Sequence, residues 1–230
     1  LTGHRGFIGK NLLNSLTEDG HTVTCWDWEE EDLPDVAGND WCLHIGAISS
    51  TAEQDIEKIL DQNYDFSKWL LNECNDNGVN FQFASSASIY GLESLFFEDS
   101  PPQPQSPYAW SKYLFERYTE KMEDEWKIRV QGFRYFNVYG PGEEHKDQPS
   151  PYTVFERQAK ETGVIKLFEG SENYLRDFVP VETVVSVHKK FFNVEKSGIW
   201  NVGTGLAHSF LDIAEEIAEI EGVEIELVPV

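Results

Sequence analysis

Tyr108 and Lys112 have the residue types and spacing that first suggest chemistry in this chain. The apolar residues that follow recur at helical spacing, so both side chains are expected on one face of a helix. A phenol has a reference pKa of about 10, and a neighbouring ammonium favours the phenolate. Such a pair could exchange a proton with a substrate hydroxyl. Tyrosine and lysine four positions apart also occur on solvated helix faces, so the pair alone does not establish catalysis.

A glycine-rich loop at residues 3–9 is the second candidate feature. It leads into a predicted helix that ends near Gly20, and residues 22–26 are then predicted as a strand that delivers Asp27. Glycines let the backbone approach a pyrophosphate, the helix N-terminus supplies amide donors, and an acidic residue about 20 positions on can bind the ribose hydroxyls. This order of elements favours a dinucleotide site over an ordinary glycine turn.

Further strands and helices alternate up to residue 140. Residues 41–45 are predicted as a buried strand, followed by small residues, and a long helix is expected over residues 53–77. Residues 81–84 form the next predicted strand, and a hydroxyl-rich turn with Ser86 follows its carboxyl end. The proline-rich residues 93–107 are expected to form a loop over the site rather than a proline-motif ligand. Alternation of this kind predicts an α/β fold, a Rossmann-type doubly wound parallel sheet.

The sequence changes character after residue 140. A polar loop, a helix over residues 151–162 and short strands near residues 166–171 and 176–179 are predicted. A return to the sheet is expected at residues 198–203, followed by a helix that Ser209 and Asp212 begin with a capping box and by a strand over residues 223–228. We therefore expect a dinucleotide-binding domain at residues 1–140. Residues 141–230 are expected to form a smaller substrate-binding lobe, interleaved with the last sheet elements and incomplete, because both chain ends look truncated.

Composition limits the classes of partner. The chain of 230 residues has 40% hydrophobic and 13% aromatic residues, which is typical of a globular protein. A formal charge of −23 argues against nucleic acid as a partner. The three cysteines, Cys25, Cys42 and Cys74, are expected to be reduced thiols in a cytoplasmic protein. No apolar run approaches the roughly 18 residues of a membrane span, and no metal site is indicated.

Taken together, the glycine loop, the Ser86 turn and the Tyr108/Lys112 pair resemble the extended short-chain dehydrogenase/reductase superfamily, the NAD-dependent epimerases and dehydratases. Members of this superfamily act mostly on nucleotide sugars. Within it, residues 46–51 and 133–141, the pair His145-Lys146 and residues 167–178 are similar to the ADP-glyceromanno-heptose 6-epimerases. The glycine loop and the Tyr/Lys pair are general to the superfamily. His145-Lys146 and residues 167–178 are the parts that point to the heptose enzymes.

This resemblance implies an epimerase that uses bound NAD(P) to oxidise the sugar transiently at C6 and to return the hydride to the other face. The reaction interconverts ADP-D-glycero- and ADP-L-glycero-manno-heptose for lipopolysaccharide core synthesis. By resemblance, Tyr108 is the acid–base residue on one face and Lys146 on the other. Ser86 would hydrogen-bond the sugar oxygen, and Lys112 would bind the nicotinamide ribose and lower the pKa of Tyr108.

The resemblance also assigns ligand contacts and implies a homo-oligomer. The residues implied to bind the cofactor are Gly3, Gly6, Phe7, Ile8, Gly9, Asp27, Trp28, Gly46, Ala47, Ser49, Asn63, Lys112, Val138 and Lys146. Those implied to bind the substrate are Ser86, Asn137, Phe168, Glu169, Gly170, Ser171 and Arg176. A guanidinium can bind a diphosphate bidentately, which suits Arg176 in so acidic a chain. Alternatively, Arg176 could pair with Asp177 or another carboxylate.

The sequence departs from this pattern at several positions. His4 and Arg5 stand where small residues are usual, Gln62 where asparagine is usual, and Thr183 where many relatives have aspartate. Acidic residues follow Asp27, and no Lys or Arg appears before Lys58. These carboxylates would repel a 2′-phosphate, so the sequence favours NAD over NADP, with Arg5 as the nearby cation that could reverse the preference.

Two other interpretations stay open at this point. The first is another nucleotide-sugar epimerase, reductase or dehydratase of the same superfamily. Ala87 and Ser88 provide no acidic residue beside Ser86, which disfavours a dehydratase. The second is a non-catalytic dinucleotide-binding fragment, which the intact Ser86, Tyr108 and Lys112 disfavour.

Overall fold

The computed structural model describes residues 1–50, 53–92, 96–146 and 148–229. The chain divides into two compact units. Unit 1 consists of Leu1–Tyr135 and Val185–Val202, and unit 2 consists of Phe136–Val184 and Gly203–Val230. The chain therefore leaves unit 1 after Tyr135 and returns to it for a helix and a strand.

Unit 1 is built on a parallel sheet with the strand order β1-β2-β3-β7. Its strands are β1 (Trp41–His44), β2 (Asn80–Ser86), β3 (Val130–Tyr135) and β7 (Gly198–Val202). The register pairs Ser86 with Tyr135, so the residue that ends β2 lies beside the end of β3. Parallel strands point their carboxyl ends to one edge, which is where ligands of such sheets bind.

The predicted strand at residues 22–26 is not formed as a strand, so that prediction is wrong. This segment joins the sheet only through an isolated parallel bridge between Thr2 and Trp26. Its sheet partner is the short segment Leu1–Thr2: the Trp26 amide donates to the Leu1 carbonyl at 3.0 Å, and the Gly3 amide to the Trp26 carbonyl at 3.1 Å. A ladder this short still brings Asp27 next to the glycine loop.

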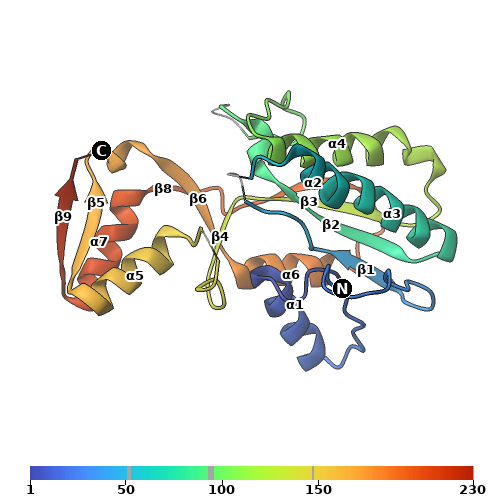
Figure 1. Ribbon diagram of the computed structural model, residues 1–230, viewed down its shortest axis with the longest axis horizontal. Coiled ribbons are helices and arrows are strands. Elements are labelled where there is room, and N and C mark those ends of the chain that lie inside the picture. Colours follow the sequence, from blue (N-terminus) through green and yellow to red (C-terminus); the bar gives the residue numbers. More distant parts are fainter. Residues whose placement is uncertain (51–52, 93–95, 147, 230) are drawn as a thin grey trace. The chain divides into compact units, whose positions relative to one another are not determined.

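Helices cover both faces of the sheet, which confirms the doubly wound architecture (Figure 1). One face carries α2, α3 and α4, and the other carries α1 and the part of α6 that belongs to unit 1 (Figure 1). The helices are α1 (Phe7–Glu18), α2 (Ile56–Leu60), α3 (Phe66–Asn77), α4 (Pro107–Lys121) and α6 (Val181–Phe191). A π-helical turn, Asp61–Asp65, interrupts the long helix predicted over residues 53–77. Such turns often occur at functional sites.

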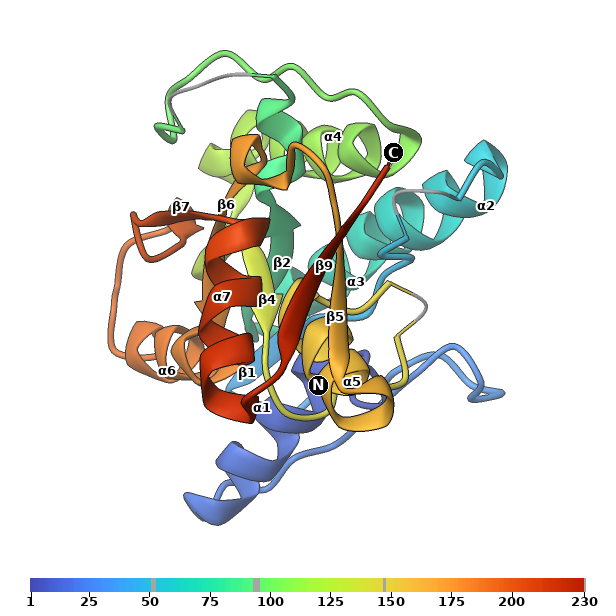
Figure 2. The same cartoon turned by 90° about the vertical axis from the view of Figure 1, so that its left-hand side faces the viewer.

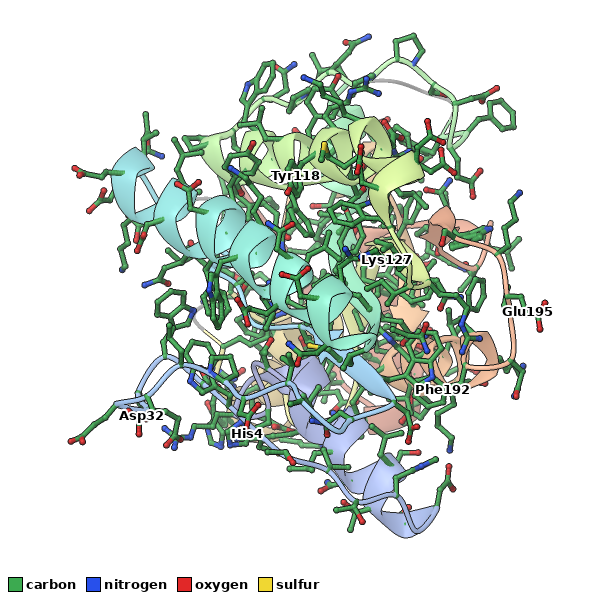
Figure 3. The ribbon with its side chains drawn as sticks, turned by 90° about the vertical axis from the view of Figure 1, so that its right-hand side faces the viewer. His4, Asp32, Tyr118, Lys127, Phe192 and Glu195 are labelled. Carbon is green, nitrogen blue, oxygen red and sulfur yellow. The ribbon has the colours of Figure 1, made fainter. Side chains whose placement is uncertain are left out.

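The core of unit 1 is aromatic. Trp26 stacks on Phe66 with ring centroids 4.7 Å apart, and Phe83 packs edge-on against Phe115 at 4.9 Å. Tyr118 joins α4 to α3 by donating a hydrogen bond to the Asn72 side chain at 3.1 Å, and it lies between these helices in Figure 3. All three cysteines are free thiols. Phe115 and Tyr118 thus attach α4 to the sheet and to α3.

Unit 2 combines two small sheets with two helices (Figure 2). β4 (Asn137–Tyr139) and β8 (Ala207–Ser209) flank β6 (Leu175–Pro180), and β5 (Val164–Phe168) pairs in parallel with β9 (Glu224–Val228). The helices are α5 (Pro151–Thr162) and α7 (Phe210–Glu221), which pack around an apolar cluster that includes Phe155, Ile165, Phe178 and Ile213. The predicted capping box of Ser209 and Asp212 is present at the start of α7.

No helix among the described residues has the length and apolar character needed to cross a membrane.

Candidate functional site

The Tyr108/Lys112 pair lies in the first two turns of α4. This helix begins here because the Ser106 side chain accepts a hydrogen bond from the Ala109 amide and Pro107 occupies the first turn. The Lys112 Nζ lies 5.9 Å from the centroid of the Tyr108 ring, which confirms that both side chains share one face. Lys112 is only 7% exposed and donates to the Ala84 carbonyl of β2 at 2.9 Å. The pair is therefore anchored against the sheet.

Ser86 lies at the carboxyl end of β2 and interacts with Tyr108. Its hydroxyl accepts a hydrogen bond from the Ser88 amide at 3.2 Å, which starts the 3-10 turn Ala87–Tyr90. A second hydrogen bond joins the Ser86 hydroxyl to the Tyr108 phenol. The structure thus brings together Ser86, Tyr108 and Lys112, which are contributed by β2 and α4.

Burial dominates the proton affinities of this group. It lowers the pKa of Lys112 to about 8, against the opposing effect of the Glu116 carboxylate. Burial also raises the pKa of Tyr108, which the hydrogen bond from Ser86 only partly offsets. The prediction that the pKa of Tyr108 is lowered is therefore wrong for this structure, because loss of hydration outweighs the hydrogen bond from Ser86.

The glycine loop packs closely against neighbouring backbone at two of its glycines. Gly3 has a φ of +72°, and a Cβ placed on it would lie 2.4 Å from the Gly46 backbone nitrogen. A Cβ on Gly9 would lie 2.0 Å from the Gly3 carbonyl oxygen. Gly6 is the N-cap of α1 and provides no side-chain cap. The first amides of α1 therefore lack a side-chain cap, and amides at such a helix start can donate hydrogen bonds to a phosphate.

Asp27 lies beside this loop. Its carboxylate accepts hydrogen bonds from the Trp28 amide at 2.9 Å and, more weakly, from the Arg5 amide at 3.4 Å. The guanidinium of Arg5 pairs with Glu29 and Glu30, with a distance of 2.7 Å between Nη2 and the Glu30 Oε1. The Arg5 guanidinium is thus engaged by the acidic segment that follows Asp27 and that includes Asp32, labelled in Figure 3.

Asn63 holds the segment after β1 in place. It is 1% exposed, and its side chain accepts from the Ile48 amide at 2.8 Å and donates to the Ile48 carbonyl at 3.0 Å. It also donates to the Ser111 hydroxyl at 3.1 Å. The predicted contact of Asn63 with a cofactor stays a prediction, and the structure shows that Asn63 supports the segment around Ile48. Gly46, Ala47 and Ser49 lie on the segment that it supports, while Thr51 lies outside the described residues.

Two buried groups near the catalytic candidates escaped the sequence analysis. Glu116 forms an ion pair with Arg134 of β3, with 2.7 Å between Oε2 and Nη2, and both side chains are nearly inaccessible. The Ser85 hydroxyl also donates to Glu116. Glu116 follows Lys112 by four positions, as Lys112 follows Tyr108, so the sequence spacing could have placed Glu116 on the same helix face. Its partner Arg134 lies on another element and has no such signal.

A cavity of about 470 Å³ in unit 1 does not include the candidate catalytic residues. It is lined by Leu1, Cys25, Trp26, Cys42 and the acidic segment 30–32, among others. The chemistry described above therefore does not lie in this cavity. No group of three or more His, Cys, Asp and Glu residues in the described part of the chain could hold a metal ion.

Apart from Ser86, which ends β2 in unit 1, the predicted substrate residues belong to unit 2. Asn137 and Val138 lie on β4, and Arg176 lies on β6. Phe168, at the end of β5, is 59% exposed and is followed by Glu169 and Gly170. Ser171 is buried and donates to the Phe168 carbonyl at 2.7 Å, which closes the turn. Residues 168–171 thus form the turn that follows β5 and precedes β6.

Arg176 does not pair with Asp177. Its Nη1 donates to the Leu175 carbonyl at 2.7 Å. The Asp177 carboxylate instead accepts from the Thr204 amide and from the Gly205 amide, at 2.9 and 2.8 Å. The described residues place no carboxylate within ion-pair distance of Arg176, so the alternative of a surface ion pair is not supported.

Lys146 lies on the loop between β4 and α5. Its Nζ is 4.0 Å from the Glu143 Oε2. Partial burial lowers the pKa of Lys146, and the negative charge of Glu143 opposes that shift. Because the effect of burial is the larger, the pKa of Lys146 is lowered overall, and this favours a lysine that gives up its proton more readily than a solvated one.

Comparison with known proteins agrees with these features. Residues 1–203 match the NAD dependent epimerase/dehydratase family. An ADP-L-glycero-D-manno-heptose-6-epimerase from Brachyspira hyodysenteriae is 46% identical over 255 residues, which cover 96% of this chain and 80% of that protein. The crystal structure of the Helicobacter pylori enzyme of the same name has a TM-score of 0.87 at 26% identity, over 99% of this chain and 84% of that one. A Thermus thermophilus UDP-glucose 4-epimerase in complex with NAD has a TM-score of 0.82 at 26% identity, covering 99% and 85%.

Proposed function

Because the chain belongs to the NAD dependent epimerase/dehydratase family, we propose that it interconverts the two C6 epimers of ADP-glycero-manno-heptose. The observation that carries this proposal is the 46% identity to an ADP-heptose epimerase over 96% of the chain. The product would serve lipopolysaccharide core synthesis. The family resemblance and the free thiols support a cytoplasmic homo-oligomer.

Bound NAD(P) would supply the hydride acceptor and donor of the reaction. Gly3 and Gly9 let the loop pack closely against the neighbouring backbone, and the uncapped start of α1 would donate amide hydrogen bonds to its pyrophosphate. Asp27, which lies beside the glycine loop, is proposed to accept hydrogen bonds from a ribose. The segment after Gly46, which Asn63 supports, is proposed to line the adjacent side of the cofactor site.

Tyr108 would take the proton of the sugar hydroxyl and later return it. The Ser86 hydroxyl, which forms a hydrogen bond with the phenol, is proposed to orient the same sugar oxygen. Burial keeps Tyr108 protonated, so its ionised form needs the ammonium of Lys112 beside it. Lys112 has a pKa of about 8, so it is mostly charged at neutral pH.

Epimerisation needs a second acid–base group, because the hydride leaves one face of the carbon and returns to the other. Lys146 is proposed for this role, and its lowered pKa supports the assignment. We assign Asn137 and residues 168–171 to the substrate. Arg176 is proposed to bind the diphosphate, which needs a local cation on a chain with a formal charge of −23.

The test is incubation of the protein with ADP-D-glycero-manno-heptose, followed by NMR of the sugar. We expect conversion to the L-glycero epimer, and we expect Tyr108→Phe to abolish it while the cofactor stays bound. UDP-glucose serves as the comparison substrate for the alternative of another nucleotide-sugar epimerase. Turnover of UDP-glucose alone, or full activity in Tyr108→Phe, would contradict the proposal.

A further inference from the structure

The loop between β4 and α5 contains a carboxylate, that of Glu143, which has no role in the chemistry described so far. Glu143 is 0% exposed, although its neighbour Glu144 lies at the surface. Burying a carboxylate costs several kcal/mol unless partners compensate for its lost hydration. Its partners therefore indicate what the loop is built to hold.

Glu143 fastens both ends of the loop to one point. Its Oε1 accepts from the Ser150 hydroxyl at 2.5 Å, from the Thr153 hydroxyl at 2.7 Å and, weakly, from the Gly140 amide at 3.4 Å. Its Oε2 accepts from the Ser150 amide at 2.9 Å. The loop start at Gly140 and the loop end at Ser150 are thus bound by a single side chain.

The attachment point is the N-terminus of α5. Ser150 is the N-cap of this helix, and Thr153 lies in its first turn. Helix N-termini favour negative charge, which helps to compensate for the burial of Glu143. Phe155 and Ala159 bury the next turns of α5 in the core of unit 2, so the attachment point is rigid.

Lys146 is carried on the same turn. Its amide donates to the Glu143 carbonyl at 3.0 Å, and its Nζ lies 4.0 Å from the Glu143 carboxylate. The backbone and the side chain of Glu143 therefore both set where the Lys146 ammonium lies.

We propose that Glu143 is a positioning residue for Lys146, which it holds in place by fastening the turn after Gly140 to the N-terminus of α5 at Ser150 and Thr153. The proposal rests on the proposed function, because it assumes that Lys146 is the second acid–base group. Glu143 itself touches neither the sugar nor the cofactor in this assignment. A misplacement of about 1 Å at a reacting group can cost roughly 100-fold in rate.

Glu143→Gln tests the proposal at constant size. An amide offers one accepting oxygen, so its NH₂ group would face either the Ser150 amide or the hydroxyls of Ser150 and Thr153. We expect kcat for ADP-heptose epimerisation to fall about 100-fold, with a much smaller change in KM. Glu144→Gln removes the same charge one position along at the surface, and it should keep the wild-type kcat.

A double variant separates positioning from general damage. If Glu143 acts through Lys146, then Glu143→Gln should cost nothing further in a Lys146→Met background, because the two changes remove the same contribution. Losses that multiply in the double variant would overturn the proposal. An unchanged kcat in Glu143→Gln would overturn it as well.

Hydrogen exchange provides a readout that does not depend on the substrate. The backbone amide of Ser150 should exchange its hydrogen faster in Glu143→Gln than in the wild type and in Glu144→Gln. Equal exchange rates would refute the attachment of the loop through Glu143. Should Glu143→Gln fail to fold, Thr153→Val removes one donor to the carboxylate, and its loss of kcat should likewise vanish in the Lys146→Met background. A wild type that does not epimerise ADP-heptose would refute the proposed function. Hydrogen exchange at the Ser150 amide would still test whether Glu143 holds the loop.

Discussion

Removal of one partner from the buried ion pair between Glu116 and Arg134 should strongly destabilise unit 1. The Arg134 Nε and Nη2 donate to the two carboxylate oxygens of Glu116 at 3.0 and 2.7 Å, a bidentate arrangement. The two side chains are 1% and 7% exposed. Arg134 also donates to the Tyr90 hydroxyl at 2.8 Å, so the pair ties α4, β3 and the turn after Ser86 together.

Removing one partner leaves the other charged and buried. Variants of this kind typically lose about 3–5 kcal/mol of stability. We therefore expect Glu116→Leu to lower the free energy of unfolding of unit 1 by about 3–5 kcal/mol. The control is Glu120→Gln on the same helix, which breaks an ion pair to Arg117 whose side chains are 57% and 45% exposed. An exposed pair is worth less than about 1 kcal/mol.

Urea unfolding followed by tryptophan fluorescence measures unit 1 specifically. All seven tryptophans lie in the residues of unit 1, so unfolding of unit 2 contributes no tryptophan signal. The double variant Glu116→Leu/Arg134→Met should be more stable than Glu116→Leu, because no unpaired charge is left buried. A loss below about 1 kcal/mol in Glu116→Leu, equal to that of the surface control, would refute this reasoning.

Two further predictions concern pH and the choice of cofactor. Burial lowers the pKa of His44 and of His188 from 6.5 to about 3, so both are neutral in the folded state. Their contribution to the free energy of unfolding is complete above pH 6.5 and is lost as the pH falls toward 3, because the unfolded chain binds protons first. A urea unfolding midpoint that stays constant between these pH values would contradict this prediction. Because Glu29 and Glu30 engage Arg5, NAD should bind more tightly than NADP. Glu29→Gln/Glu30→Gln should strengthen NADP binding about tenfold in titrations, since one charge-assisted hydrogen bond is worth about 1.5–3 kcal/mol, and an unchanged NADP affinity would show the reasoning wrong.

Local signals explain which elements could be predicted. The helix over residues 151–162 was predicted with its observed bounds, because Ser150 and Pro151 start it and Gly163 adopts the left-handed conformation that ends it. Residues 22–26 carried the β-branched pattern of a strand, yet they form only one bridge. A strand also depends on the neighbour that pairs with it, and that neighbour is not visible in the pattern of the strand itself.

The sequence by itself determined the parallel α/β architecture, the glycine loop and the placement of Tyr108 and Lys112 on one helix face, because all of these follow from spacing along the chain. Tertiary structure decided the rest. It buried Tyr108 enough to raise its pKa where a neighbouring charge alone would lower it. It also joined Glu116 to Arg134 and turned Glu143 inward against the start of α5. Burial and charge pairing depend on residues from different elements, so they become definite only when the chain has folded.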